Sequence, residues 1–501
     1  MREKLAIVDS PKLDSLRMST LLGLLALSAQ SDPVSVNLSC DIAIVGAGPG
    51  GIFFAWRFLK AAETIGSVCI LERSNRHGGR IYSLRNLGPR ADLTVDVGAY
   101  RYAPQPYQEG SWYVYTPLLG GLIDTALGLP SAIYEPGKPV RKIVDAYGEN
   151  AGYATFVDIM LSQIQSDAHM SQRLDLRFHE ELISITPAAP HGGPVTLTFL
   201  TGLTVTATTV VLNLPQLPLL KVLERSETLF EGAVPPALLA PLPSEGAKLY
   251  VHYTNAWWRN ILNLTSGAFG VPPFNSTGVQ VGQLPDLAGR YHDGHTRCDG
   301  TTEGTRCRGF LEATYTYGDN ARFFLTEMLH TDSPYTTLNY SRPLGKTALD
   351  GIHAKLVEYH RDALDRVQGY NATALVEALR PEFATLSYWG AQTAGYGGAV
   401  HNTRDGPFIR VEDEAPKALA PFGDQRIYVA NEAYGALRGT DGVLGGHHGW
   451  AECSLVMAEN VLVQKLGLKP PSWMNSSIYD EYVMFKYDAS ERKRRSGWHQ
   501  G

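Results

Sequence analysis

The sequence has 501 residues, a length that fits about three domains. Hydrophobic residues make up 44% and charged residues 19% of it, so the chain can bury a sizeable core and is not intrinsically disordered. The formal net charge of −6 disfavours a nucleic-acid partner, and no apolar run approaches the ~18 residues of a membrane span.

Residues 1–35 have the features of a signal or leader segment. The apolar run 21–27, followed by Ser28 and Ala29, resembles a signal-peptide core with its cleavage site. The stretch before that run is long for a signal peptide, and Met18 is an alternative start. Glycosylation sequons, which favour a secreted product, lie at Asn37, Asn263, Asn275, Asn339, Asn371 and Asn475. The alternative is a cytoplasmic protein in which the sequons arise by chance.

A glycine-rich turn between a strand and a helix is the strongest motif. The apolar run 42–45 leads into Gly46, Gly48 and Gly51, and an amphipathic run over 52–62 follows. The first glycine permits a tight turn, the second lets the backbone approach a pyrophosphate, and the third lets helix and strand pack closely. The free N–H groups of the helix N-terminus favour phosphate. The motif therefore predicts a dinucleotide site.

Two further segments extend this site. A second strand over 67–71 ends in Glu72, near the spacing expected of an acid that binds adenosine ribose. The loop 73–80 carries two adjacent glycines between arginines, which suits a phosphate, although a solvated basic loop is the alternative. A short strand over 95–97 then turns into a loop that ends in Arg101.

The remaining elements alternate between helical and strand-like patterns. Helices are predicted over 116–127, 153–165, 348–365, 372–379 and 449–462. Strands are predicted over 174–185, 195–200, 204–212, 248–253, 309–317, 388–400 and 427–430. Because an apolar strand and helix return near the C-terminus, one nucleotide domain is expected to be assembled from distant segments, with another domain inserted between them.

Five cysteines are too few for a disulfide scaffold. Cys298 and Cys307 bracket a polar loop, where a local disulfide would fit an oxidising compartment. Cys69 and Cys453 lie in apolar runs and are predicted to be buried thiols. No Cys/His spacing indicates a metal site.

These residues carry a resemblance to a known family. The glycine run 46–51, together with Glu72, Arg76 and the run 78–80, resembles the flavin-containing amine oxidase superfamily. The stretch 427–432 resembles the C-terminal strand and acid of that family, with Asn431 in place of the usual glycine. Within the superfamily, the stretches most similar to L-amino-acid oxidases are 98–101, 315–321, 420–423 and 448–450.

The resemblance implies an α/β protein with an FAD-binding, Rossmann-like domain of the glutathione-reductase type, a mixed-sheet substrate domain and a small helical insertion. The implied bounds are 36–96, 171–243 and 415–466 for the FAD domain, 97–115 and 244–414 for the substrate domain, 116–170 for the insertion, and 467–501 for a tail.

The resemblance further implies non-covalent FAD, since no cysteine lies near Trp389, where monoamine oxidases attach their flavin. The implied FAD-binding residues are Gly46, Gly48, Pro49, Gly50, Gly51, Glu72, Arg73, Gly79, Arg80, Gly98, Ala99, Tyr100, Leu182, Glu432, Gly449 and Trp450. Glu432 is expected to bind the ribityl or pyrophosphate region through hydrogen bonds.

The implied reaction is the oxidative deamination of L-amino acids to 2-oxo acids, ammonia and hydrogen peroxide, with oxygen as acceptor. Arg101 would bind the substrate carboxylate, with a structural ion pair as the alternative role. The other implied substrate-binding residues are Tyr291, Trp389, Gly449 and Trp450. An ordinary surface position is an equal alternative for Tyr291, as core packing is for Trp389.

Lys248 resembles the family lysine that holds a water near the flavin, and a surface lysine at a strand end is the alternative. Burial would lower its pKa, so it could assist proton removal, imine hydrolysis or oxygen activation. The competing functions are an amine or polyamine oxidase of the same superfamily and a non-catalytic FAD-binding protein. The expected partners are a small amino acid and oxygen, and the resemblance also allows a homodimer.

Overall fold

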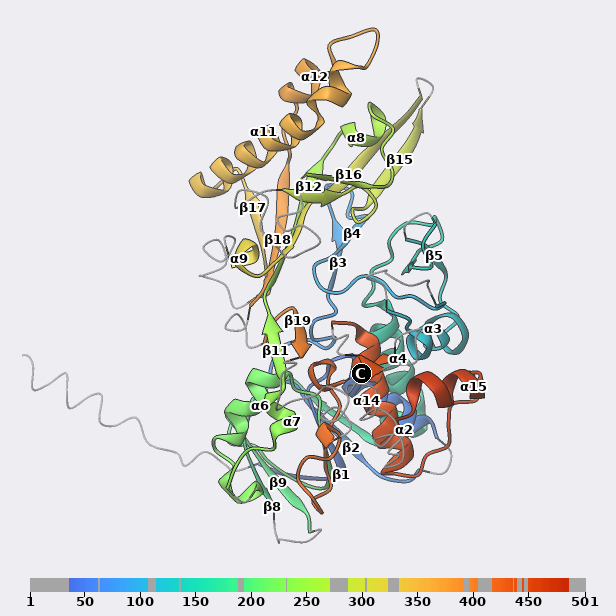
Figure 1. Cartoon of the computed structure of the whole chain (residues 1–501), viewed down its shortest axis with the longest axis vertical. Coiled ribbons are helices and arrows are strands. Elements are labelled where there is room, and N and C mark those ends of the chain that lie inside the picture. Colours follow the sequence, from blue (N-terminus) through green and yellow to red (C-terminus); the bar gives the residue numbers. More distant parts are fainter. Residues whose placement is uncertain are drawn as a thin grey trace, which may run out of the picture.

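The computed structural model of the protein has two lobes (Figure 1). The described residues are 36–61, 64–106, 114–134, 137–187, 193–230, 232–270, 287–301, 304–322, 333–390, 396–403, 417–435, 437–438, 444–445 and 449–485. The expected leader, Asn275, His447, His448 and the end of the tail from 486 lie outside these ranges. Within them, no helix is long and apolar enough to cross a membrane.

The first lobe is built on a seven-stranded sheet in which β7, β2, β1, β10, β9 and β8 follow one another, with β20 also paired to β10. The strands are β1 (Asn37–Val45), β2 (Val68–Leu71), β7 (Leu174–Arg177), β8 (Leu182–Pro187), β9 (Val195–Phe199), β10 (Thr204–Leu212) and β20 (Ile427–Val429). β7, β2, β1, β10 and β20 run parallel, and β9 and β8 are antiparallel. The C-terminal strand thus joins the N-terminal ones, which confirms the predicted Rossmann-like class.

The turn after β1 forms because glycine occupies its critical positions. Gly46 has φ 101°, a conformation that side chains with a Cβ rarely adopt. Helix α2 (Pro49–Lys60) then begins with proline at its first position, where no N–H is needed. A Cβ on Gly51 would lie 2.2 Å from the Gly46 carbonyl oxygen, so only glycine allows this contact between helix and strand.

Helices cover this sheet and lie beside the predicted insertion (Figure 1). α2 packs between α4 (Thr155–Ser166) and α14 (Ala451–Gln464). The other elements of the lobe are α3 (Pro117–Gly120), η1 (Gly121–Ala126), β5 (Ser131–Ile133), β6 (Arg141–Ile143), α5 (Ala168–Ser171), α6 (Gln216–Leu223), η2 (Glu227–Leu229), α7 (Pro236–Leu239), η3 (Glu432–Tyr434), β21 (Leu437–Arg438), β22 (Leu444–Gly445), α15 (Ser476–Ile478) and η4 (Tyr479–Val483). The buried Glu452 carboxylate of α14 accepts the N–H groups of Leu118 and Leu119 at 2.8 and 2.7 Å, which anchors α3.

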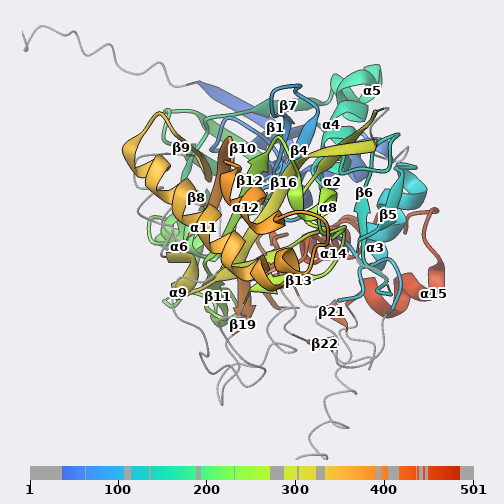
Figure 2. The same cartoon turned by 90° about the horizontal axis from the view of Figure 1, so that it is seen from above.

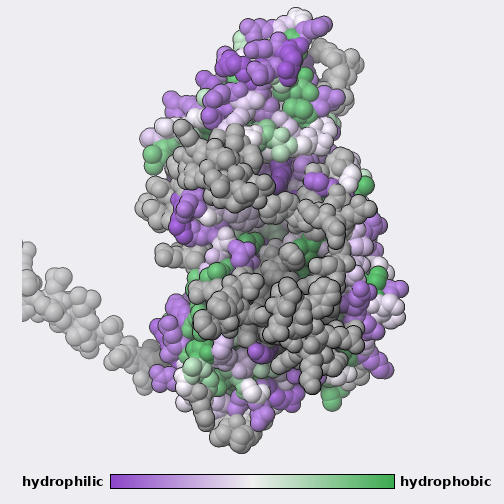
Figure 3. Space-filling model, in the orientation of Figure 1, coloured by the Kyte–Doolittle hydropathy of each residue, from purple (hydrophilic) through white to green (hydrophobic). Residues whose placement is uncertain are grey.

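The second lobe is an antiparallel sheet in which β13, β14, β16, β12, β18 and β17 follow one another, with β15 paired to β16. The strands are β12 (Gly246–Tyr253), β13 (Ala268–Gly270), β14 (Ala288–Arg290), β15 (Thr296–Thr301), β16 (Gly304–Tyr317), β17 (Tyr335–Asn339) and β18 (Phe383–Trp389). The helices are α8 (Trp257–Asn260), α9 (Asp319–Arg322), α11 (Pro343–Asp365) and α12 (Ala372–Ala378). α11 and α12 lie over one face of the sheet (Figure 2), and Leu349 and Leu356 share a core with Leu249 and Leu311. The end formed by α11 and α12 is mainly hydrophilic (Figure 3).

Two connections join the lobes. β11 (Pro241–Ser244) pairs with β19 (Val400–Thr403) as a ribbon between the two main sheets. The hairpin of β3 (Ser83–Leu87) and β4 (Leu93–Asp96) packs its apolar residues against Tyr250 and Phe310 of the second lobe. This hairpin belongs to the predicted first segment of the FAD domain, and the domain bounds stay a prediction.

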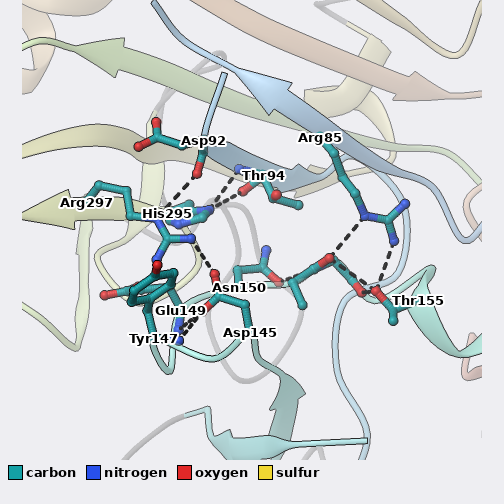
Figure 4. A network of polar contacts seen from close by, with 12 residues as sticks. Arg85, Asp92, Thr94, Asp145, Tyr147, Glu149, Asn150, Thr155, His295 and Arg297 are labelled. Atoms are coloured by element: carbon teal, nitrogen blue, oxygen red, sulfur yellow. Dashed lines mark hydrogen bonds and ion pairs between the residues drawn. The ribbon is translucent and has the colours of Figure 1, made fainter. Parts of the chain in front are cut away.

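A polar network crosses between the hairpin, the insertion and β15 (Figure 4). Arg297 of β15 forms an ion pair with Asp145, and the N–H of Thr94 donates to Nδ1 of His295 at 2.8 Å. Arg85 donates to the hydroxyl of Thr155 at 3.0 Å. Each contact joins segments more than 65 positions apart in the sequence, so the network fixes the lobes relative to each other.

Two predicted strands are wrong in extent. The run 174–185 forms β7 and β8 with a turn between them, where His179 has φ 63°. The run 388–400 is not one strand, because β18 ends at Trp389, opposite the first residue of its partner β12. Gly397 and Gly398 then have φ 73° and 110°, which are incompatible with an extended strand.

The prediction for Cys69 is also wrong. β1 and β2 are neighbours in the sheet, and Cys40 and Cys69 form a disulfide with their Cα atoms 6.1 Å apart. The expected disulfide between Cys298 and Cys307 is present, and Cys453 is a free, buried thiol as predicted.

Candidate active site

A cavity of about 800 Å³ lies where the carboxyl ends of β1, β2 and β10 meet the second lobe. Ligands of open α/β sheets bind at this edge. The predicted site residues that line the cavity are Gly46, Gly48, Pro49, Glu72, Arg73, Gly79, Arg80, Gly98, Ala99, Leu182, Lys248, Trp389, Glu432, Gly449 and Trp450. One cavity thus gathers residues from the start, middle and end of the chain.

The glycine turn is held open by hydrogen bonds from two polar side chains. Glu72 accepts the N–H of Ala47 at 2.9 Å and that of Ser74 at 2.8 Å. The amide nitrogen of Asn213 donates to the Gly46 carbonyl at 3.1 Å, and a Cβ on Gly48 would lie 2.9 Å from that nitrogen. The turn therefore has no room for side chains and exposes backbone to the cavity, which fits a pyrophosphate.

Asn213 was not predicted, although its sequence position carried a signal. It directly follows β10, so it stands at the carboxyl end of a parallel strand beside the glycine turn. Asn431 lies two residues after the end of β20, and its amide nitrogen donates to the Asn213 carbonyl at 3.2 Å. Both asparagines line the cavity. The side chain of Asn431, which stands in place of the usual glycine, thus adds a hydrogen bond between the ends of β20 and β10.

Lys248 lies at the inner end of the cavity and is almost fully buried. Its Nζ donates to the carbonyl oxygens of Asp96 and Gly98 at 3.0 and 2.6 Å, and lies 3.7 Å from the centre of the Tyr100 ring. Burial lowers the pKa of Lys248 to about 7, although the Glu312 carboxylate opposes this shift. An amine with this pKa exchanges a proton near neutral pH, so the surface alternative does not apply.

Aromatic side chains and a helix N-terminus complete the walls. The indole N–H of Trp389 donates to the Val97 carbonyl at 2.6 Å, and its ring centre lies 5.0 Å from that of Tyr396. Both rings line the cavity. Gly449 has φ 92° and precedes Trp450, the N-cap of α14, so the open N–H groups of this helix lie at the cavity.

Arg101 lies in a buried charge cluster next to the cavity and is not one of the lining residues. Its guanidinium is 4.8 Å from the Tyr100 ring centre and 5.2 Å from that of Tyr134. Tyr100, also predicted as a cofactor residue, likewise stands behind the wall and accepts a hydrogen bond from Arg290 at 3.1 Å. Arg101 is therefore separated from Lys248 by the Tyr100 ring.

Two carboxyl groups complete the charge cluster. Burial and the Glu312 carboxylate raise the pKa of Asp293 well above its usual range, which favours the neutral form of this carboxyl group. Arg290 faces Asp293 at 3.5 Å. The neutral form of Asp293 leaves the Glu312 carboxylate beside the guanidinium groups of Arg101 and Arg290.

Three further predicted residues, besides Arg101 and Tyr100, do not line the cavity. Gly50 and Gly51 act through packing, since a Cβ on Gly50 would lie 2.8 Å from the Ala430 carbonyl oxygen. The hydroxyl of Tyr291 pairs with Nε2 of His360 at 2.7 Å, among aromatic residues under α11. Its assignment to the substrate carboxylate stays a prediction that this position does not favour.

The contacts of Glu432 differ from the expected direct bond to a cofactor. One carboxylate oxygen accepts the N–H of His401 at 3.0 Å and that of Gly449 at 2.7 Å. The other lies 2.6 Å from Nη2 of Arg80 and 2.9 Å from Nδ1 of His401. Glu432 lines the cavity, yet both its oxygens are occupied by protein groups.

Comparisons with known proteins match parts of the chain. Residues 44–116 match the NAD(P)-binding Rossmann-like domain. The chain is 39% identical over 64 residues to achacin of Lissachatina fulica and 34% identical over 71 residues to aplysianin-A of Aplysia kurodai, which is 13% and 14% of this chain. It is 29% identical over 103 residues, 21% of its length, to the FAD-binding monooxygenase trt3 of Aspergillus terreus. It spans 11% to 13% of the length of these curated relatives.

Solved structures of putrescine oxidase are similar over a longer stretch. The wild-type enzyme bound to putrescine is 12% identical, with a TM-score of 0.48, and the alignment covers 86% of this chain and 100% of that one. A double mutant of the same oxidase gives the same values.

The strand–glycine–helix turn, the parallel sheet and the Rossmann-like match define a dinucleotide-binding domain in this chain, and its cofactor is FAD. The series formed by Glu72, Arg76 and Arg80 resembles the flavin-containing amine oxidase superfamily, and β20 returns to the sheet as that resemblance implies.

Proposed function

We propose that the protein is an L-amino-acid oxidase. FAD, when bound, would accept the electron pair of the substrate Cα–H bond as a net hydride and pass the electrons to oxygen. The balanced reaction converts an amino acid, oxygen and water to a 2-oxo acid, ammonia and hydrogen peroxide.

The observation that carries the proposal is the charge balance beside Lys248. Arg101 and Arg290 bring two guanidinium groups to a buried cluster in which burial and the Glu312 carboxylate raise the pKa of Asp293 and so favour its neutral form. The resulting excess of positive charge favours a carboxylate, which guanidinium groups bind through paired hydrogen bonds. A simple amine has no group to compensate this charge.

Lys248 supplies the proton chemistry in this proposal. With a pKa lowered by burial to about 7, its neutral form is available to accept a proton, and its carbonyl partners fix its position. Trp389 and Tyr396 form an aromatic wall that excludes water from the reacting carbon.

A peroxide assay over the 20 amino acids and several amines, including diamines, tests the proposal. We expect turnover of amino acids and little turnover of amines. Arg101→Met keeps the stem between the tyrosine rings and removes the charge, so we expect kcat/KM for amino acids to fall about 10- to 100-fold, the cost of a charged hydrogen bond. Arg361→Met, in an exposed ion pair with Glu377, is the control.

Other outcomes point to the alternatives. Preferential turnover of amines would replace the proposal by an amine or polyamine oxidase, with the Glu312 carboxylate as the ammonium partner. A yellow, FAD-loaded protein without activity on the panel would favour a non-catalytic flavoprotein. Unchanged amino-acid turnover in Arg101→Met would refute the carboxylate role of Arg101.

We also propose an oxidising, extracellular compartment and a dissociable cofactor. The two disulfides support the compartment, because such bonds persist outside reducing cytoplasm. Mass spectrometry of the secreted protein would detect glycans at Asn263, Asn339 and Asn371, and acid precipitation would release the flavin into the supernatant.

A further inference from the structure

His401 touches the wall of the FAD cavity and has no role in the function proposed above. It lies in β19, is fully buried, and contacts Glu432 twice. Its backbone N–H donates to one carboxylate oxygen at 3.0 Å, and its ring Nδ1 lies 2.9 Å from the other. Nη1 of Arg80 is 3.2 Å from the same ring nitrogen.

The neighbours of the ring decide its tautomer. Nδ1 lies near both a Glu432 carboxylate oxygen and Nη1 of Arg80, and with a proton on Nδ1 the ring donates to the carboxylate. Nε2 is buried and has no hydrogen-bond partner among the described residues, so a proton there would be left unsatisfied. These contacts favour the tautomer that carries its proton on Nδ1.

This donor completes the shell around Glu432. The carboxylate receives hydrogen bonds from Arg80, from the backbone and ring of His401, and from the backbone of Gly449. Because these hydrogen bonds fix the Glu432 carboxylate, the carboxylate in turn fixes the groups that donate to it. Arg80 and Gly449 both line the cavity, so the position of the ring controls two parts of its wall.

The strand that carries His401 connects this shell to the second lobe. His401 pairs with Pro243 of β11, and the chain continues from β11 into β12, which carries Lys248. The same residue thus contacts Glu432, which lines the cavity, and lies in the ribbon between the lobes.

We infer that His401 is a positioning residue of the FAD site, which holds Glu432 and, through it, Arg80 and Gly449 in the geometry that binds the cofactor. The inference rests on the proposed FAD-dependent function. It replaces the expected direct contact of Glu432 with FAD by an indirect one.

The test compares two substitutions in the purified holoenzyme. His401→Leu removes the Nδ1 donor, whereas His401→Asn places an amide nitrogen where it can replace that donor. Flavin fluorescence on serial dilution gives the dissociation constant of FAD. We expect at least a 10-fold weaker FAD affinity for His401→Leu and a change within 3-fold for His401→Asn.

His353→Leu is the matched control. His353 is also a buried histidine that bonds through Nδ1, to the Tyr253 hydroxyl at 2.9 Å, but it lies in the core of the second lobe. We expect this variant to lower the thermal stability and to leave the FAD dissociation constant unchanged.

Three results would overturn the inference. These are wild-type FAD affinity in His401→Leu, equal weakening in both His401 variants, and equal weakening in His353→Leu. If the wild-type protein itself binds no FAD, the proposed function fails first, and that outcome is distinguishable because it does not depend on any variant.

Discussion

At the scale of single residues, Lys248 shows how burial opposes favourable contacts. Two carbonyl oxygens and the Tyr100 ring stabilise the ammonium form, and the Glu312 carboxylate does so as well. Desolvation nevertheless dominates and lowers the pKa to about 7. A lysine with this property could not be distinguished from a surface lysine by sequence alone.

The pKa of Lys248 predicts the pH dependence of activity. If the neutral amine is the active form, kcat/KM rises with pH and levels off above about 7. Lys248→Met should lose this rise with pH, and its kcat/KM should be lower by about 10²- to 10⁴-fold, the usual contribution of a proton-transfer group. A pH profile measured from 5.5 to 9 checks both statements. If the variant kept the rise with pH, the rise would belong to another group.

The same shift also predicts a change in stability. The folded-state pKa lies below the ordinary lysine value of 10.5, so the unfolded chain binds more protons between pH 7 and 10.5. The free energy of unfolding contributed by this residue therefore rises with pH over that window. In urea unfolding, the free energy of unfolding of the wild type minus that of Lys248→Met should therefore rise between pH 7 and 10.5.

At the scale of secondary-structure elements, the contact between β1 and α2 creates the phosphate end of the cavity. Gly46 makes the turn, Gly48 leaves space beside Asn213, and Gly51 lets the helix approach the strand. These three requirements are local, which is why the glycine spacing alone predicted them. The polar support from Asn213 and Glu72 comes from other strands of the sheet.

A methyl group at the third glycine should disrupt this contact. In Gly51→Ala the new Cβ would lie 2.2 Å from the Gly46 carbonyl, so helix or strand must move, at a cost of about 1–3 kcal/mol as in overpacked cores. We expect lower stability in urea and a smaller fraction of flavin retained after gel filtration.

Gly351→Ala gives a matched control in a second helix. Gly351 lies in α11 with nothing within 4 Å of its added Cβ, so alanine should stabilise the helix by about 0.5–1 kcal/mol. If both substitutions changed the stability in the same direction, the close approach at Gly51 would not be the cause.

At the scale of the whole molecule, the cavity exists only because the two lobes are held together. The first lobe supplies the glycine turn and Glu432, whereas the second supplies Lys248 and Trp389. The β11–β19 ribbon, the β3–β4 hairpin and the polar network of Figure 4 make the connection. A change in the network should therefore affect the site from a distance.

Arg297 offers the most direct test of this coupling. Its guanidinium bonds to Asp145 and to the carbonyl of Asp92 at 3.4 Å, so it links three segments. Arg297→Met should reduce the stability by about 1.5–3 kcal/mol, the value for hydrogen bonds to charged groups. Scanning calorimetry should show a lower transition temperature, with the two lobes unfolding less cooperatively.

The exposed pair of Lys355 and Glu358 on α11 provides the comparison. Lys355→Met should change the stability by less than about 0.5 kcal/mol, because exposed ion pairs contribute little. Equal effects of the two substitutions would show that the network does not connect the lobes.

The sequence by itself determined the features that depend on neighbouring residues. The turn at Gly46, the helix after Pro49, the acid at the end of β2 and the disulfide of Cys298 with Cys307 all follow from short spacings. Short spacings restrict the backbone directly, so these features were predictable, as was the assembly of one sheet from both ends of the chain.

Only the tertiary structure decided which distant residues meet. The pairing of Cys40 with Cys69, the place of Tyr291 beside His360 and the shell that His401 builds around Glu432 depend on strand order and lobe packing. One amino-acid sequence carries no direct record of such contacts, because many registers bury the same apolar residues. The parts of the cavity wall that short sequence segments form were predictable. The distant side chains that hold those segments in place could be identified only in the folded chain.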